Sequence, residues 1–231
     1  MGSDAAESAY LGASGTAYHE GKRAVPPGAR PWIVQSRAAL FQPWIRASDA
    51  VFEFGCGFGW NLAGLRCATR AGHDVAEVLR SEVEAVGAAF VARMESLADA
   101  SFDVAISHHS LEHVPDPRQT LCDLHRILKP GGLLLLAVPW ERERRYRRFD
   151  PDEPNHHLFS WNAQTLGNLV AVSGFRVEHA GVRSYGYDRR AALLAVRWRL
   201  GGAGFQAVRS FLRAARPLRE VVVRARPEAS A

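Results

Sequence analysis

Short apolar segments recur along the 231-residue chain, separated by segments in which apolar residues follow helical spacing. The clearest apolar segments are Ala50–Phe54, Phe102–Ser107 and Leu133–Val138. A fully apolar run such as LLLLAV is typical of a strand that is buried on both faces of a parallel sheet. Strands that alternate with helices imply parallel βαβ units, so the sequence predicts a doubly wound α/β fold.

The remaining elements fit the same alternation. Helical spacing predicts helices, and short apolar runs between turn-forming residues predict strands. Pro43 should end or kink the first helix, and Ser160 should cap a later one. The predicted helices are Pro31–Ile45, 58–65, 75–86, Asp116–Leu128, 160–172 and, interrupted at Gly201-Gly202, 190–215; further strands are predicted at 68–72, 88–92, Phe175–Val182 and Glu220–Ala225.

Charge and cysteine content limit the classes of function. The net charge of +5 is concentrated in residues 183–231, which hold eleven arginines and three acids. No basic motif with interleaved aromatic residues occurs there, so we expect a solvated helical face and no nucleic-acid partner. Cys56, Cys67 and Cys122 form no CxxC pair, which predicts a reducing, cytoplasmic location. We expect neither a membrane span nor a secretion signal, because the longest apolar run is far too short and the N-terminus is small and polar.

A glycine-rich turn follows the first predicted strand. The segment Glu53–Gly59 reads EFGCGFG, with the spacing GxGxG rather than the GxGxxG of dinucleotide-binding folds. Glycines let the backbone approach a ligand closely and adopt positive φ, and the helix that follows presents free N–H groups. Glu53 stands two residues before Gly55, where its carboxylate could meet a ligand's ammonium group.

An acid follows the second predicted strand. Asp74 lies 19 residues after Gly55, and a carboxylate at this point can accept hydrogen bonds from both ribose hydroxyls of a nucleotide. Because NAD(P)-dependent enzymes use an acid in the same way, Asp74 alone does not distinguish between cofactors.

Two blocks in the middle of the chain carry a family resemblance. They read FDVAISHHSLEHVPDP from Phe102 to Pro117 and LHRILKPGGLLLLAVP from Leu124 to Pro139. With the glycine-rich turn, the LEH motif and the LKPGG turn resemble those of class I S-adenosylmethionine-dependent methyltransferases. The resemblance extends from about Val51 to Phe175, and it is specific for fold and cofactor but not for the methyl acceptor.

The resemblance implies S-adenosylmethionine as the cofactor. It also implies that Ser107 and His108 flank the methionine part. Arg93 stands where the family often has an Asp that bonds the adenine amino group, so either backbone groups do this work or the alignment shifts by a residue or two. The implied cofactor residues are Glu53, Gly55, Cys56, Gly57, Gly59, Asp74, Met94, Ser107 and His108.

Methyl transfer needs a general base only if the acceptor carries a proton to lose. The candidates are His109, His156 and His157, because histidine titrates near neutrality. His113 of the LEH motif is interpreted as a hydrogen-bonded structural residue. His109 and His113, four residues apart, could form a metal site with His156 or His157. We expect no metal, because the LEH histidine recurs in the resembled family without one.

The resembled family also implies an architecture. We expect a Rossmann-like, mostly parallel seven-stranded sheet with an antiparallel last strand. Glu220–Ala225 should insert beside Leu133–Val138, with Phe175–Val182 at the edge. Residues 1–48 would form an N-terminal segment and helical cover, 49–231 the methyltransferase domain, and about 187–217 a helical insertion.

Two further segments are candidates for contacts at the acceptor site. Tyr18, His19 and Trp32 precede the first strand and could belong to the cover. Glu141–Arg148 (ERERRYRR) is either a solvated loop or a lid over an acidic substrate.

The function predicted from these observations is methyl transfer to O, N or C of a small metabolite or biosynthetic intermediate. Two alternatives stay open. An NAD(P)-dependent oxidoreductase would share the fold, although GxGxG and LKPGG argue against it. A methyltransferase-like module without catalysis would keep the fold and bind cofactor without turnover. The sequence gives no indication of the oligomeric state.

Overall fold

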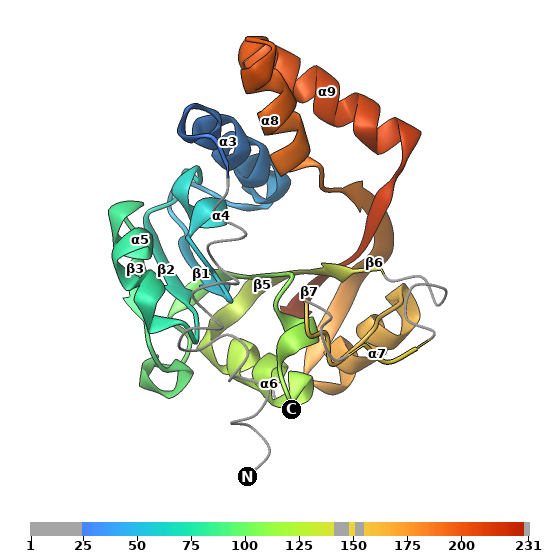
Figure 1. Ribbon diagram of the computed structural model, residues 1–231. Helices are drawn as coiled ribbons and strands as arrows, with labels where there is room; N and C mark the ends of the chain where they lie inside the picture. The colour runs from blue at the N-terminus through green and yellow to red at the C-terminus, as the bar shows by residue number, and fades with distance from the viewer. Residues whose placement is uncertain (1–24, 141–147, 151–154, 229–231) are drawn as a thin grey trace.

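Seven strands form one sheet in a computed structural model that describes residues 25–140, 148–150 and 155–228 (Figure 1). The strands are β1 (Ala50–Phe54), β2 (Thr69–His73), β3 (Ala89–Val91), β4 (Phe102–His108), β5 (Leu128–Pro139), β6 (Phe175–Tyr185) and β7 (Leu218–Pro227). Their order across the sheet is β3-β2-β1-β4-β5-β7-β6. Strands β1 to β5 pair in parallel, whereas β7 runs antiparallel to both neighbours. This is the predicted doubly wound, Rossmann-like sheet.

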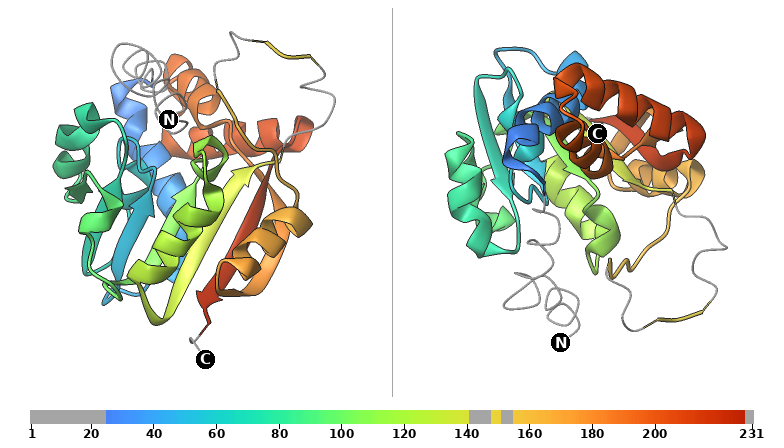
Figure 2. Two further views of the ribbon diagram at one scale, coloured as in Figure 1. Left: turned by 90° about the horizontal axis from the view of Figure 1, so that it is seen from below. Right: turned by 45° about the horizontal axis from the view of Figure 1, so that its top comes forward.

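Helices cover both faces of the sheet (Figures 1 and 2). On one face, α6 and α7 pack on a core that includes Phe52, Leu134 and Val223. On the other face, α3, α4 and α5 pack against Val51, Ile106 and Leu135, whose side chains alternate with the first set along the strands. The helices are α3 (Arg30–Phe41), α4 (Trp60–Ala63), α5 (Arg80–Ala85), α6 (Pro117–Ile127), α7 (Ala163–Val172), α8 (Asp188–Arg197) and α9 (Gly201–Ala215).

The last strand lies inside the sheet, as predicted. Val221 pairs with Val138 of β5 and with Val182 of β6, so β7 is flanked on both sides and β6 forms the edge. The valines of β7 are buried at Val221 and Val223. The placement of β7 brings its first residues to the carboxyl end of β5.

The helical insertion between β6 and β7 joins the N-terminal helix in a common cover. Ala191 and Ala195 of α8 and Phe205 of α9 share a buried cluster with Ile33 of α3 and with Trp60. Trp32, a predicted cover residue, lies 5.9 Å from Phe205 between ring centroids. Figure 1 shows α8 and α9 on the same side of the molecule as α3. No helix in the described part of the chain has the length and apolar character needed to cross a membrane.

Several predicted boundaries were wrong for local reasons. The helix predicted at 58–65 is only α4, because Gly57 and Gly59 adopt left-handed φ values of 53° and 68° that a helix excludes. The segment 75–86 begins as a 3-10 turn and becomes helical only at Arg80. The break between α8 and α9 falls before Gly201, at Arg199 with φ 53°.

Two further details differ from the prediction. Asn162, not Ser160, caps α7: its side chain accepts a hydrogen bond from Thr165 N, and the Thr165 hydroxyl bonds back to Asn162. Strand β5 begins at Leu128, the first residue of the LKPGG motif, and the motif appears as a shift in its pairing with β4. The prediction that Pro43 ends the first helix is confirmed, because α3 stops at Phe41 and a 3-10 turn follows.

Candidate active site

The glycine-rich loop leaves β1 at the carboxyl edge of the sheet and is fixed to β2. The backbone N–H groups of Gly55 and Cys56 both donate to the carbonyl oxygen of His73, at 2.8 and 2.9 Å. Gly55 has φ 69°, in the left-handed region where a side chain is strained. Cys56 is buried, and burial raises the pKa of its thiol well above the usual range, so the thiol stays neutral.

Gly57 and Asp74 meet across this loop. The Gly57 N–H donates to Asp74 Oδ2 at 2.8 Å, and Asp74 Oδ1 accepts from Ala76 N at 3.0 Å. A Cβ atom added to Gly57 would meet no heavy atom within 4 Å, so there is open space beside the loop. Two residues predicted to contact one nucleotide-like ligand therefore lie together next to a free volume.

Glu53 lies beneath the loop as a fully buried carboxyl group, 0% exposed. Asn61 Nδ2, from α4, donates to Glu53 Oε1 at 2.5 Å, whereas Oε2 is buried without a hydrogen-bond partner among the described residues. Burial raises the pKa of Glu53 to about 8, against the smaller lowering effect of Asn61. A buried acid with one unsatisfied oxygen fits an approaching ammonium group, since that cation would satisfy the oxygen and favour ionisation.

The end of β4 supplies the next predicted residues. Ser107 is fully buried, and its Oγ has no hydrogen-bond partner within the described ranges. His108 packs edge-on against Phe41 of α3, with its Nδ1 3.4 Å from Asn61 Nδ2. Ser110 Oγ donates to the carbonyl oxygen of Gly55 at 3.2 Å, which ties the segment after β4 to the glycine-rich loop. The structure thus brings Ser107 and His108 to the same edge as the loop.

The two residues predicted near the adenine position, Arg93 and Met94, differ from each other in burial. Arg93 is exposed and pairs with Glu95 at 3.6 Å, and its carbonyl oxygen accepts from Ser96. Met94 is buried in the core beneath α6, and its carbonyl oxygen accepts a hydrogen bond from Arg126 at 2.9 Å.

Glu220 is a site residue that the sequence interpretation missed. It stands on β7, is 0% exposed, and accepts from two sides: His109 Nε2 lies 2.8 Å from Oε2, and Arg183 Nε donates to Oε1 at 2.5 Å. Burial alone would raise the pKa of Glu220, but the contacts from His108 and His109 outweigh burial and hold it far below its usual range. No local pattern in the sequence marks this role, because a single acid before the valines of β7 does not by itself indicate a site.

His109 is held in an unusual conformation beside Glu220. Its φ of 56° is left-handed, which is uncommon for a residue other than glycine and occurs often at functional sites. The ring of Tyr185, from β6, meets the imidazole edge-on at 4.6 Å between centroids. The imidazole of His109, just after β4, is therefore contacted by side chains of two other strands, β6 and β7.

The other predicted histidines, His113, His156 and His157, are not grouped with His109. His113 lies in a 3-10 turn, η5 (Leu111–His113), and its Nε2 is 3.8 Å from Glu112 Oε1. His157 Nε2 lies 4.0 Å from the same oxygen. His156 is exposed, with φ 49°. The grouping of His109 with His113 is wrong, because the turn after β4 is not an α-helix and does not stack residues four apart.

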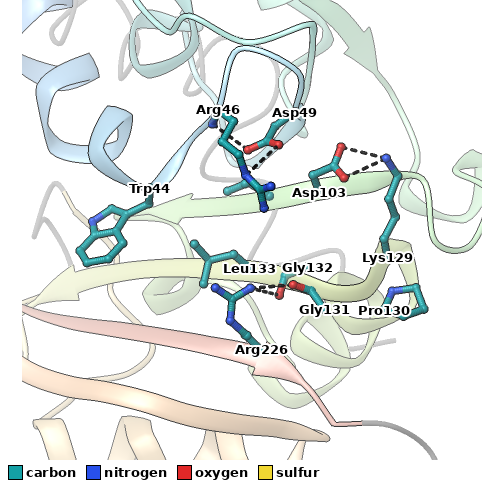
Figure 3. A pocket seen from close by; sticks show the side chains of 11 residues that line it. Trp44, Arg46, Asp49, Asp103, Lys129, Pro130, Gly131, Gly132, Leu133 and Arg226 are labelled. Carbon is teal, nitrogen blue, oxygen red and sulfur yellow. Dashed lines mark hydrogen bonds and ion pairs between the residues drawn. The ribbon is translucent and has the colours of Figure 1, made fainter.

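A pocket at the opposite edge of the sheet does not belong to this site (Figure 3). It lies at the amino ends of β1, β4 and β5, whereas ligands of open α/β sheets bind at the carboxyl ends. Its charged groups also have partners within the protein: Lys129 lies 2.8 Å from Asp103, and Arg226 Nη1 donates to the carbonyl oxygen of Gly131 at 2.6 Å. The predicted contacts at Tyr18, His19 and 141–147 lie outside the described residues.

Comparisons with known proteins identify the family of the chain. Residues 30–180 match the model of a family described as methyltransferase domain. A probable S-adenosylmethionine-dependent methyltransferase of Mycolicibacterium smegmatis is 30% identical over 168 residues, covering 70% of this chain and 63% of the relative. The ubiquinone biosynthesis O-methyltransferase of Pseudomonas paraeruginosa is 34% identical, covering 46% of this chain and 48% of the relative. The chain covers 63%, 32% and 50% of the lengths of the first three matched relatives, so it spans less than two thirds of each.

Solved structures share the fold. A possible histamine N-methyltransferase of Thermotoga maritima superposes with a TM-score of 0.59 at 19% identity, covering 86% of this chain and 90% of that one. A putative methyltransferase of Bacillus halodurans gives 0.59 at 18% identity, covering 84% and 99%. The predicted cofactor, S-adenosylmethionine, is confirmed as that of the family. Because the family model spans more than half of the chain, the protein belongs to the class I S-adenosylmethionine-dependent methyltransferases.

Proposed function

We propose that this protein transfers a methyl group from S-adenosylmethionine to an oxygen or nitrogen atom of a small metabolite, with His109 as the general base. The observation that carries the proposal is the 2.8 Å contact between His109 Nε2 and the buried Glu220 carboxylate. This contact lies at the carboxyl end of β4, where Ser110 joins the same segment to the glycine-rich loop.

The residues around that loop fit the cofactor. Gly55, Cys56, Gly57 and Gly59 would line its path, Asp74 would accept from the ribose, and Glu53 would face the ammonium group. Ser107 and His108 would flank the methionine part. The unsatisfied buried oxygens of Glu53 and Ser107 support this assignment, because buried polar atoms in native proteins normally have partners.

Bound S-adenosylmethionine supplies an activated methyl group: the acceptor's lone pair bonds to the methyl carbon as the carbon–sulfur bond breaks, and that bond's electrons stay on sulfur. The chain contributes position and proton transfer. With Nε2–H donating to Glu220, Nδ1 is the basic nitrogen of the His109 ring and takes the acceptor's proton. Glu220 fixes the ring and stabilises the imidazolium that forms.

His109 is a better base than the other two candidates. A fully buried carboxylate holds it at hydrogen-bond distance, whereas His157 lies 4.0 Å from Glu112 and His156 is exposed. The family membership favours methyl transfer over NAD(P)-dependent redox chemistry. Three free cysteines fit a reducing, cytoplasmic setting.

The proposal is tested by methyl transfer from isotopically labelled cofactor to a panel of small phenols, catechols, carboxylic acids and amines. We expect at least one acceptor to be labelled by the wild-type protein. The His109→Gln variant should lose turnover while binding the cofactor with unchanged affinity. Labelling by His109→Gln at the wild-type rate would remove His109 from the mechanism. Cofactor binding with no turnover on any acceptor would favour the non-catalytic module instead.

A further inference from the structure

We propose that Glu112, His113 and His157 form a site for one divalent transition-metal ion, of the kind that two imidazoles and a carboxylate select, such as Zn²⁺. The three residues come from two segments that are far apart in sequence, the turn after β4 and the segment before α7. Their ligand atoms all lie within 4.8 Å of one another.

The spacing of these atoms suits a shared cation better than direct hydrogen bonds. His113 Nε2 and His157 Nε2 lie 3.8 and 4.0 Å from Glu112 Oε1, beyond the 2.7–3.2 Å range of N–H···O hydrogen bonds. In a tetrahedral zinc site, bonds of about 2.0–2.1 Å place ligand atoms about 3.4 Å apart. Shortening the two distances to Glu112 Oε1 by about half an ångström would therefore bring each imidazole to the spacing of a zinc ligand.

The backbone already holds the two segments together. The carbonyl oxygen of Glu112 accepts from Leu158 N at 2.8 Å and from Phe159 N at 3.3 Å. His113 N donates to Ser110 O at 3.1 Å, which closes the turn. The rings of His113 and His157 then meet edge to face, with centroids 4.9 Å apart. Because these contacts come from the main chain, the three side chains converge without needing the ion.

The second cluster of histidines and a carboxylate, at Glu220, is less suited to a metal ion. At Glu220, His109 is within hydrogen-bond distance and the Arg183 guanidinium occupies the other carboxylate oxygen. A guanidinium at 2.5 Å repels a second cation and already supplies the counter-charge. We therefore assign the ion to Glu112, His113 and His157 and the proton-transfer role to His109 and Glu220.

The three side chains of the proposed metal site differ in burial. The Glu112 side chain is 1% exposed, whereas those of His113 and His157 are each 14% exposed. Three protein ligands with an accessible fourth position are typical of catalytic rather than structural zinc. If the proposed function holds, the fourth ligand would be an acceptor oxygen, whose proton the ion would make more acidic. This departs from the metal-free interpretation of the sequence.

The test is metal binding by the full chain after removal of adventitious ions with a chelator. Zn²⁺ and Co²⁺ are titrated separately, with Mg²⁺ as the oxygen-preferring comparison. We expect one Zn²⁺ per chain and a Co²⁺ absorption spectrum typical of low coordination number. His113→Ala and His157→Ala should each weaken Zn²⁺ binding at least about 100-fold, because loss of an outer-shell partner alone costs 10–100-fold. Thermal melts verify that each variant is folded.

His156→Ala is the matched control, since it removes an exposed imidazole next to His157 and should leave Zn²⁺ affinity unchanged. Equal Zn²⁺ affinity in wild type and His157→Ala would overturn the proposal, as would loss of the ion in His109→Ala instead. S-adenosylmethionine affinity is measured in parallel without metal. If the wild-type protein did not bind S-adenosylmethionine, the proposed function would be refuted, but the metal site would not.

Discussion

The two halves of the carboxyl edge are built in different ways. Around β1 and β2, the contacts join residues close in sequence: Asn61 lies eight residues after Glu53, and Asp74 lies 17 residues after Gly57. Around β4 and β7, the His109–Glu220 contact spans 111 residues and depends on the antiparallel insertion of the last strand. The contacts of the proposed cofactor loop are therefore local in the chain, and those of the proposed acceptor chemistry are not.

This difference separates two experimental signatures. Changes in the glycine-rich half should alter cofactor affinity, with catalysis lost only as a consequence. Changes around Glu220 should alter turnover and its dependence on pH while cofactor affinity remains. A glycine-loop variant that altered turnover alone, or a Glu220 variant that altered cofactor affinity, would contradict this comparison.

The largest effect is expected from Gly57→Val. A valine at φ 53° would be strained, and its side chain would project into the open space assigned to the cofactor, so binding should fall below detection. Gly131→Val is the matched control, because Gly131 has φ 75° and equally open surroundings but lies at the opposite edge. Calorimetry with S-adenosylhomocysteine measures both. Retained affinity in Gly57→Val would place the cofactor elsewhere.

Loss of the Glu220 charge should have the next largest effect. General acid–base catalysis contributes about 10²–10⁴-fold, so Glu220→Gln should lower kcat by about 10-fold or more while the cofactor Kd changes less than about twofold. As a positioning residue, Glu220 should also shift the acid limb of the kcat–pH profile when replaced. Glu178→Gln, at a carboxylate of β6 paired with Arg224 and Arg226, is the control. An unchanged pH profile in Glu220→Gln would reduce Glu220 to a structural role.

Asp74→Ala should have a moderate effect on affinity. Hydrogen bonds to a charged group are worth about 1.5–3 kcal/mol, which corresponds to roughly 10- to 150-fold in Kd. Asp74→Asn keeps an acceptor oxygen and should lose less. A change below about twofold in Asp74→Ala would make Asp74 only the partner of the Gly57 and Ala76 amides.

The smallest expected effect is the release of a proton from Glu53 when the cofactor binds. Because burial raises the pKa of Glu53 from 4.5 to about 8, the free protein holds this carboxyl protonated at pH 7. Facing an ammonium group would ionise it, so cofactor binding at pH 7 should release close to one proton, measured by calorimetry in buffers of different ionisation enthalpy. Glu53→Gln should release none from this position. Equal proton release in both proteins would contradict the assignment.

The same shift predicts the pH dependence of stability. A carboxyl group with a raised folded-state pKa stabilises the fold most below pH 4.5, and this contribution is lost as pH rises through about 8. The free energy of unfolding of the cofactor-free protein should therefore fall across this range. Glu53→Gln should flatten that part of the profile.

Much of the sheet could be predicted from the sequence because its signals are local. The run Leu133–Val138 and the valines of β7 identify buried strands, and the family resemblance correctly placed one beside the other. Helix lengths were harder to predict, since the left-handed glycines of the loop delay α4 to Trp60. Asn162 rather than Ser160 caps α7 because its partner Thr165 completes a reciprocal pair that the pattern did not reveal.

The candidate site, like the sheet, could be predicted where its signals are local in the sequence. The predicted cofactor positions of the glycine-rich loop lie close together in sequence, whereas Ser107 and His108 reach the same edge from β4 and Met94 lies in the core. Glu220 and Arg183 carry no local signal: an acid and an arginine on adjacent strands acquire a role only when the antiparallel pairing aligns them. Long-range pairs of this kind need the folded structure.

The central claim is that the glycine-rich edge binds S-adenosylmethionine, and calorimetric titration of the full chain tests it most directly. S-adenosylmethionine and S-adenosylhomocysteine should each bind at one site per chain, with binding abolished in Gly57→Val and retained in Gly131→Val. NAD⁺ and NADP⁺ should give no saturable heat under the same conditions. Saturable binding of a nicotinamide cofactor, with none of S-adenosylmethionine, would contradict the account.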